Sequence, residues 1–377
     1  MSDISIMSRT CAEVDSNFRR RWGAFVATSV YGHYQQTVEY ATLRQNSGWR
    51  ARFVWKETEG QIAAGTLLLS KGLAGLGLGL GMGMMPCGPI WQHGHEPSVR
   101  HVLEAVGEHC AANGIVFCRS NMRCCAEEFR EIAALLPRPR RELQQIWSYW
   151  NLSRACMEMD ISEPLETLLN RMHRHTRQEY RKSQECGVRV RKADGTQISE
   201  LVRLLSLTSE RKRLRAHETG YFSVLLNTYD PENVNLLLAE ANGEVIGATL
   251  EVTDGRTAYW LYGGFDYGKR HFHPNVALQI EMIRWAQHRG CKYYDLGDAC
   301  TSWPPLETDK GYGVFRFKTR LGAQAKLCAP YCDFIYRPVL YRLAGLAENI
   351  GLPFAMESGK SKILVAVQRL RVNRELV

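Results

Sequence analysis

A glycine-bounded segment near the end of the chain, Gly311 to Ala323, holds a lysine that could act on a developing negative charge. Its sequence, GYGVFRFKTRLGA, alternates in type and is interpreted as a strand at a turn of a sheet. The alternation places Lys318 on one face with Val314 and Arg316, and Phe317 on the other. An ammonium held beside a sheet opening would stabilise the oxyanion of a tetrahedral intermediate by ~3 kcal/mol. An exposed strand cation is the alternative.

Basic residues gather along one predicted helix in the second half of the chain. They recur at spacings of three to four residues, so they form one cationic stripe. The stripe consists of Arg171, Arg174, Arg177, Arg181 and Lys182. Such a face is either solvated or bound to a polyanion. The net charge of +9 favours a nucleic acid, a phosphorylated metabolite or an anionic membrane face as the partner.

A second basic cluster lies in the same half of the chain, just before two aromatic residues. Its members are Arg211, Lys212, Arg213 and Arg215. Tyr221 and Phe222 follow, an order that suits a phosphate contact beside a stacking ring. Two clusters in one half strengthen the polyanion interpretation.

The strands and helices that must position these residues are predicted from a sequence pattern that occurs twice in the chain. Phe53 to Leu67 (FVWKETEGQIAAGTL) and Leu236 to Leu250 (LLLAEANGEVIGATL) align without a gap at an offset of 183 residues. Each pattern is an apolar strand, a polar turn with glycine and a second apolar strand, which predicts a β-hairpin.

A helix followed by a strand recurs at nearly the same offset. Val99 to Asn121 predicts an amphipathic helix, a glycine and the strand IVFCRS, and Asn275 to Asp298 predicts a helix, a glycine and the strand KYYDLG. Two such units in the same order indicate tandem copies of one α/β domain with a mostly antiparallel sheet, as in the GNAT acyltransferase fold. We expect a first domain over residues 1–155 and a second over 156–330, with 331–377 packing back on the first.

The second copy is expected to begin with the strand MEMDIS near Met157. A helix should follow, with its N-cap at Ser162 and its stop at Gly187. The tail from Tyr331 is expected to form a helix on the first copy, or a basic amphipathic segment that contacts the inner membrane face.

Length and composition limit the class of protein. With 377 residues, 45% of them hydrophobic, the chain is too long for one ordinary domain and too apolar for a disordered one. Twelve cysteines with no Cys-x-x-Cys pair and no signal peptide indicate the reduced thiols of a cytoplasmic protein. The uncharged run Gly72 to Ile90 contains GLGLGLGMGM, which predicts a strand or a ligand-facing loop rather than a membrane span. We expect a monomer without metal or cofactor.

Neither copy has the Arg/Gln-x-x-Gly-x-Gly/Ala loop with which GNAT domains hold the pyrophosphate of coenzyme A. The second copy reads FDYGKRHFHPNVALQ at that place, and the first reads GPIWQHGHEPSVRHV. An acyl-CoA donor is therefore disfavoured, and another activated acyl group has to be considered.

With these segments in this order, the chain resembles the FemABX family of aminoacyl-tRNA-dependent peptidyltransferases, in its arm-free, FemX-like branch. The second copy carries the resemblance in RQEYRKSQECGV, TSERKRLRAHETGYF, YWLYGG and GYGVFRFKTRLGA, and the first in HYQQTVEYATLRQNSGW and MMPCGPI. The resemblance implies a tandem GNAT fold. It also implies transfer of an aminoacyl group from aminoacyl-tRNA to the stem-peptide amine of a UDP-linked or lipid-linked muramyl peptide.

The resemblance further implies roles for single residues. Lys318 falls where the family has a lysine that supports the tetrahedral intermediate, and Phe317 where a phenylalanine helps to place the aminoacyl end. Arg44 takes the place of a lysine that contacts nucleotide phosphates, and Tyr40 that of a tryptophan. The other substrate-binding candidates are Arg211, Arg215, His217, Tyr221 and Tyr262. The cationic stripe is the candidate tRNA-binding surface.

The general base is left open. Ser120 and Asn121 stand where the family often has an acidic residue, and Asp295 and Asp298 lie near a strand end, where an aspartate commonly ties a loop to backbone N–H groups. Two other functions also stay open. One is a tandem GNAT N-acyltransferase that takes an acyl-CoA or carrier-bound donor for a sugar or lipid amine, and the other is a noncatalytic RNA-binding protein.

Overall fold

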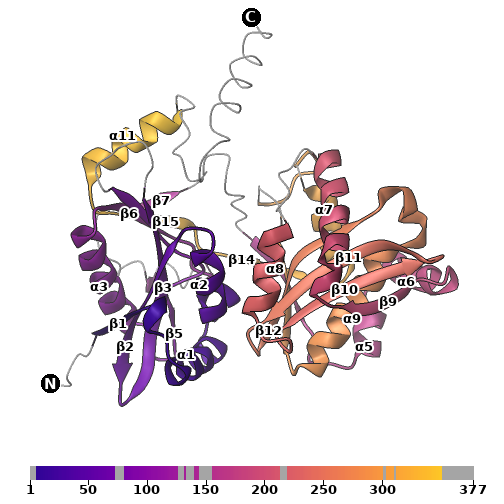
Figure 1. Cartoon of the computed structure of the whole chain (residues 1–377), viewed down its shortest axis with the longest axis horizontal. Coiled ribbons are helices and arrows are strands. Elements are labelled where there is room, and N and C mark those ends of the chain that lie inside the picture. Colours follow the sequence, from indigo (N-terminus) through magenta and orange to yellow (C-terminus); the bar gives the residue numbers. More distant parts are fainter. Residues whose placement is uncertain are drawn as a thin grey trace, which may run out of the picture.

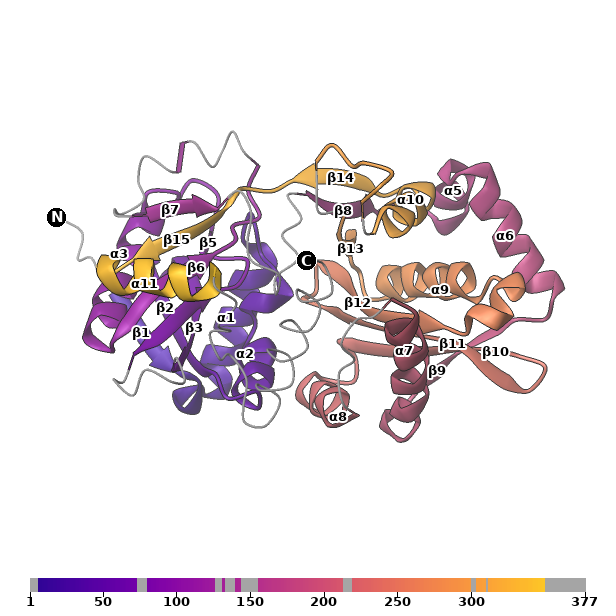
Figure 2. The same cartoon turned by 90° about the horizontal axis from the view of Figure 1, so that it is seen from above.

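The structure, a computed structural model, describes residues 6–72, 80–125, 131–132, 140–143, 155–212, 219–299, 303–309 and 311–349. Two sheets lie next to each other, one built mostly from the first half of the chain and the other from the second (Figure 1 and Figure 2). Helices flank both sheets. The predicted α/β architecture with two mixed sheets is therefore confirmed.

The first sheet has the strand order β1-β2-β3-β4-β6-β15-β7, and β5 pairs with β3 at its side. Its strands are β1 (Ile6–Thr10), β2 (Arg50–Thr58), β3 (Gln61–Gly72), β4 (Gly81–Met85), β5 (Ile90–Trp91), β6 (Ile115–Ser120), β7 (Arg140–Leu143) and β15 (Tyr331–Ile335). Its helices are α1 (Ser16–Thr28), α2 (Val38–Gln45), α3 (Ser98–Ala112) and α11 (Pro338–Asn349). Of the run Gly72 to Ile90, residues 73–79 lie outside the described residues, and β4 forms the strand predicted for the rest.

The second sheet has the order β14-β8-β13-β12-β11-β10-β9. Its strands are β8 (Ala155–Asp160), β9 (Arg189–Ala193), β10 (Val234–Ala241), β11 (Glu244–Thr253), β12 (Thr257–Phe265), β13 (Tyr293–Asp298) and β14 (Gln324–Leu327). Its helices are α5 (Leu165–Arg171), α6 (Arg174–Glu185), α7 (Ile198–Lys212), α8 (Thr219–Thr228), α9 (Pro274–His288) and α10 (Tyr312–Arg320).

The two predicted hairpins, β2–β3 and β10–β11, share even their irregularities. A β-bulge interrupts the first ladder between Lys56 and Glu57, and another interrupts the second between Ala239 and Glu240, at the same offset of 183 residues. Both turns use two residues of positive φ, Glu59–Gly60 and Asn242–Gly243, as a tight hairpin turn requires. The duplication predicted from the sequence therefore extends to backbone detail.

The predicted helix–strand pairs are also present, as α3–β6 and α9–β13. The strand that follows each helix joins its sheet next to a parallel neighbour: β6 pairs with β4, and β13 with β12. All other strand pairs described in the two sheets are antiparallel.

Apolar side chains explain why both faces of each sheet are covered. In the first half, Trp22 of α1 packs with Phe53 under one face, and Leu103 of α3 is buried under the other. In the second half, α9 buries Ile283 in one core, while Phe222 of α8 belongs to the core on the opposite face. Burial of these apolar side chains is the main favourable contribution to folding.

The chain returns to the first sheet at its end. Tyr331–Ile335 forms β15 between β6 and β7, so the tail that the sequence predicts as a helix begins as a strand. An ion pair at 2.7 Å between Arg119 and the fully buried Asp333 fixes it. The helix α11 begins after this strand, and its Leu340 and Tyr341 pack against the core that contains Trp22 and Phe53. Within the described part of the chain, no helix is both long and apolar enough to cross a membrane.

The single basic helix predicted from Ser162 to Gly187 is wrong in two respects. Ser162 donates its backbone N–H to Asp160 in a turn, and α5 begins only after Pro164. The helix also breaks at Met172 and His173, which have extended backbone angles. The break buries Met172 in the core and lets the His173 N–H bind the carbonyl oxygen of Arg320. The stripe is therefore divided, with Arg171 on α5 and its other four members on α6.

Candidate functional site

The strands β12 and β13 separate shortly after they begin to pair. Their parallel ladder covers only three residue pairs, from Thr257 with Tyr293 to Tyr259 with Asp295. Beyond it, β12 continues to Phe265 and β13 to Asp298 without bonding to each other. This opens the sheet at its centre.

Lys318 lies in this opening and contacts both strands. Its ammonium donates a hydrogen bond to the backbone carbonyl oxygen of Asp298 on β13 at 2.7 Å. It also lies 5.7 Å from the centroid of the Trp260 ring on β12, within the range of a cation–π contact. Lys318 is only 6% exposed, so its charge is shielded from bulk water. It is thus a shielded positive charge held at a sheet opening.

The strand predicted for the segment of Lys318 is wrong, because Tyr312–Arg320 forms α10. The inward positions lie three or four residues apart, as on a helix: Phe315 and Phe317 pack against the core, and Lys318 and Leu321 are buried. Packing of this face on the core outweighs the strand preference of its valine and aromatic residues. The ring of Phe317 stands edge-on to Trp260 at 6.4 Å, so Phe317 and Lys318 both lie beside Trp260 rather than on opposite faces of a strand.

An ion pair between Arg123 and Asp295 joins the two halves beside this opening. Arg123 follows the end of β6, and Asp295 lies on β13. Asp295 also accepts the backbone N–H of Gly297 at 2.6 Å, which is the loop-tying role anticipated for an aspartate here. Arg123 cannot be predicted as part of this site from the sequence, since no local pattern distinguishes it from other arginines.

Asp298 differs from Asp295. Asp298 is the last residue of β13 and is exposed. Within the described residues, its carboxylate makes no ion pair. Protein atoms nevertheless crowd this recess, and their burial of the carboxyl raises the pKa of Asp298 to about 6. The nearby charges of Arg123 and Lys318 act in the opposite direction and hold the pKa down.

Three of the predicted substrate-binding residues come together where α2 packs against α8. The guanidinium of Arg44 lies 5.2 Å from the ring of Trp49, and its Nε is buried without a hydrogen-bond partner. The hydroxyl of Tyr262 donates to that of Tyr221 at 3.1 Å. Burial raises the pKa of both tyrosines and brings that of Tyr40 to about 12, so these rings stay neutral. We call Arg44, Tyr40, Tyr221 and Tyr262 the tyrosine–arginine cluster.

The remaining substrate-binding predictions are not placed. Arg215 and His217 lie outside the described residues, as does the side chain of Arg211 at the end of α7. At the position where an acidic residue was sought in the first half, Ser120 donates to the Gly88 carbonyl oxygen at 2.5 Å. Asn121 accepts the backbone N–H of Cys87. Both side chains therefore support the turn that contains Cys87 and Gly88.

The basic stripe lies on the outer side of the second sheet, next to α10. Arg174, Arg181 and Lys182 of α6 are exposed, and so is Arg171 of α5, which pairs with Glu163 at 2.9 Å. Arg177 donates to the Asn170 carbonyl oxygen and is half-buried. Since the start of α6 is bonded to the end of α10 at Arg320, the stripe and Lys318 belong to one packed unit.

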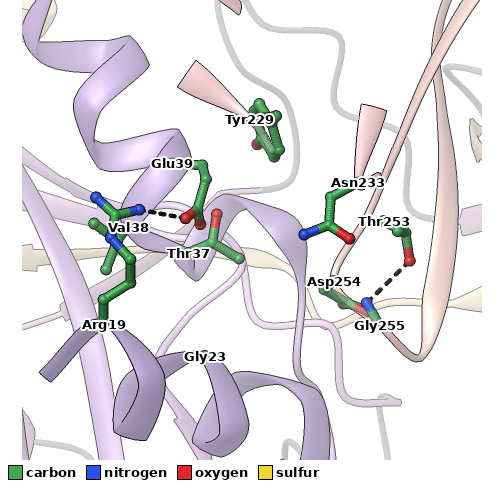
Figure 3. A pocket seen from close by; sticks show the side chains of 10 residues that line it. All are labelled: Arg19, Gly23, Thr37, Val38, Glu39, Tyr229, Asn233, Thr253, Asp254 and Gly255. Atoms are coloured by element: carbon green, nitrogen blue, oxygen red, sulfur yellow. Dashed lines mark hydrogen bonds and ion pairs between the residues drawn. The ribbon is translucent and has the colours of Figure 1, made fainter. Parts of the chain in front are cut away.

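Two cavities lie between the halves, and neither is lined by Lys318. One of about 170 Å³ is bordered by an Arg19–Glu39 ion pair on the first half and by Asn233 and Asp254 on the second (Figure 3). Another of about 150 Å³ borders the Arg123–Asp295 pair. Most cysteines in the described ranges are buried, and no group of three metal-ligating side chains occurs there.

Comparisons with known proteins agree with this architecture. Residues 19–129 match the model of the FemAB family, and residues 170–318 match that of an acetyltransferase (GNAT) domain. The solved structure described as "Crystal structure of FemX" is similar, with a TM-score of 0.79 and 18% identity, over 90% of this chain and 99% of that one. A tandem GNAT protein from the clavulanic acid biosynthesis pathway has a TM-score of 0.51 and 8% identity, over 89% and 99% of the two chains.

Curated relatives share parts of the sequence. The UDP-N-acetylmuramoylpentapeptide-lysine N(6)-alanyltransferase of Weissella viridescens is 24% identical over 147 residues, 38% of this chain and 44% of that enzyme. A Lipid II:glycine glycyltransferase of Staphylococcus haemolyticus is 31% identical over 109 residues, 29% and 26% of the two chains. That of Staphylococcus aureus (strain MRSA252) is 20% identical over 391 residues, 85% and 92%. The chain thus matches less than half the length of the first two relatives.

The family models, the relatives and the solved structures all indicate the same kind of protein, and each half of the chain matches its own family model. The resemblance to the FemABX family predicted from the sequence is therefore confirmed: the chain has a tandem GNAT-like fold and is similar to the alanyltransferase and the glycyltransferases named above.

Proposed function

We propose that this protein moves an aminoacyl group from aminoacyl-tRNA to the stem-peptide amine of a peptidoglycan precursor, either UDP-MurNAc-pentapeptide or lipid II. The position of Lys318 carries the proposal, because its ammonium contacts both β12 and β13 where they no longer pair. An ester carbonyl that enters this opening would meet a shielded positive charge. The printed names of the relatives support the class of substrate.

Aminolysis of an activated ester needs little more than such a positive charge and two well-placed substrates. It is accelerated when amine and carbonyl are held together and when the oxyanion of the tetrahedral intermediate is stabilised. Lys318 supplies the charge and Phe317, beside Trp260, shapes the space for the aminoacyl end. No redox step is required.

The donor and acceptor would occupy different surfaces. We assign the tRNA to the exposed arginines and lysine of α5 and α6, which lead to α10. We assign the phosphates of the acceptor to the tyrosine–arginine cluster, where the Arg44 Nε is buried and unpaired, since such a donor is costly to bury without a ligand. Arg211, Arg215 and His217 are proposed to add to this side.

The same proposal includes the predicted arrangement of the chain. Residues 1–155 with 331–377 would form one domain and 156–330 the other, within a monomer that works in the cytoplasm, where charged tRNA is found. Peripheral contact with the inner membrane face would use α11, on which Val339 and Leu343 are 72% and 55% exposed.

The test is a transfer assay with the purified full chain, a pool of charged tRNA and muramyl peptides in nucleotide-linked and lipid-linked form. We expect a product whose mass exceeds that of one acceptor by an aminoacyl residue, and we expect ribonuclease pretreatment of the tRNA to abolish it. No product with any acceptor would overturn the proposal. Product formed from acyl-CoA after ribonuclease treatment would indicate an N-acyltransferase instead.

A further inference from the structure

We propose that the carboxylate of Asp298 is the general base that accepts the proton of the attacking amine, an assignment that rests on the proposed aminoacyl transfer. Asp298 is the residue whose backbone carbonyl oxygen binds Lys318. The proton acceptor and the positive charge for the oxyanion are thereby held by one residue of β13. A group that acts on the nitrogen and a group that acts on the oxygen of the same tetrahedral centre have to lie this close together.

Other carboxylates around the opening are already engaged. Asp295 is paired with Arg123, accepts the Gly297 N–H and is 3% exposed, so an incoming amine cannot reach it. Glu158 on β8 forms an ion pair with Lys326. Asp298 is exposed and makes no ion pair with any residue in the described ranges, so its carboxylate is accessible to a substrate.

The surroundings of Asp298 give its carboxylate a suitable basicity. Burial raises its pKa to about 6, while Arg123 and Lys318 prevent a larger rise. A base of this strength is mostly ionised at neutral pH and still accepts a proton far better than an ordinary aspartate with a pKa near ~3.9. The bound amine, with an unperturbed pKa near ~10.4, arrives as an ammonium and has to lose a proton before it attacks.

Asp298 takes one proton from the ammonium, and the freed nitrogen forms a bond to the ester carbon while the carbonyl electron pair moves to oxygen beside Lys318. The second nitrogen proton passes to the ribose oxygen as the ester C–O bond breaks. Asp298 then gives its proton to water, so each turnover yields an amide, a free ribose hydroxyl and one proton.

The test compares D298N and D298E with the wild type and with D230N as a matched control, since Asp230 is an exposed aspartate in the same half. Single-turnover transfer is measured from pH 5 to 9 with saturating tRNA and acceptor, and binding of both substrates is measured separately. We expect D298N to lose ~100-fold or more of the rate with unchanged binding and unfolding temperature. D298E should recover part of the rate, and D230N should match the wild type.

The pH profile distinguishes a base from a structural residue. Below pH 6 the wild-type rate should fall more steeply than that of D298N, by one further order of magnitude per pH unit, because Asp298 becomes protonated. A D298N rate within threefold of the wild type, or an acidic limb shared by both, would overturn the assignment while leaving the proposed function intact. Absence of transfer by the wild type would overturn both.

Discussion

Arg123, just beyond the last residue of β6, forms an ion pair with Asp295 on β13 and so links the first sheet of the chain to the second. The two side chains are 19% and 4% exposed. A pair this well shielded does not tolerate the loss of one partner, because the other charge would stay buried without compensation.

Replacing Arg123 by alanine is therefore expected to lower the free energy of unfolding by about 3 kcal/mol, measured by urea denaturation at pH 7. The surface pair of Arg284 and Glu281, with 45% and 28% exposure, offers the control, and R284A should change stability by less than about 0.5 kcal/mol. The double variant R123M/D295L should regain most of the loss. Equal stability of R123A and R284A would contradict this account.

Replacing Lys318 by methionine keeps the length of the side chain and removes its charge. We expect the single-turnover rate of transfer to fall about 100- to 1000-fold, the effect of removing one oxyanion donor, while both substrates still bind. T319A, an exposed neighbour on α10, should retain the wild-type rate. If K318M transfers within threefold of the wild type, the ammonium does not act on the intermediate.

The exposed arginines of α6 are expected to contact phosphates of tRNA. In R174Q/R181Q the affinity for tRNA should fall, and the slope of log affinity against log salt concentration should decrease by about 2, since each lost phosphate contact releases about one counterion fewer. R50Q/R100Q removes the same charge from exposed positions of the first half and should leave the slope unchanged. If both double variants changed the salt dependence equally, net charge rather than the position of these arginines would explain tRNA binding.

The thiols of Cys156 and Cys328 lie 3.8 Å apart at the start of β8 and just beyond β14. The hydrogen bond between the two thiols lowers the pKa of Cys328 below that of an ordinary thiol, although burial acts against it. Alkylation of Cys328 by iodoacetamide should therefore rise with pH around a midpoint below the ~8.5 of an ordinary thiol, and in C156A this midpoint should move upward. Peptide mass spectrometry follows the reaction, with the exposed Cys186 as reference for reagent activity. A wild-type midpoint above 8.5 would refute the prediction.

The repeated hairpins can be predicted from the sequence because the residues that specify each turn and its two strands are neighbours along the chain. Glycine at Gly60 and Gly243 permits the positive φ of a tight turn, and the apolar runs on either side can pair only as strands of a hairpin. Local patterns also predict α9 and β13 with nearly correct ends. They fail for α10, where alternation and helical spacing coexist in one short segment and only the packed core selects between them.

The sequence by itself thus determined that one unit occurs twice and that basic residues concentrate in the second copy, and it predicts Lys318 and Phe317 as catalytic candidates. Only the tertiary structure decided that the basic helix is divided, that Arg44 meets Tyr221 and Tyr262, and that Lys318 is held by Asp298. These contacts join residues 20 to more than 200 positions apart. Their formation depends on how whole sheets and helices pack, which no spacing along the chain encodes.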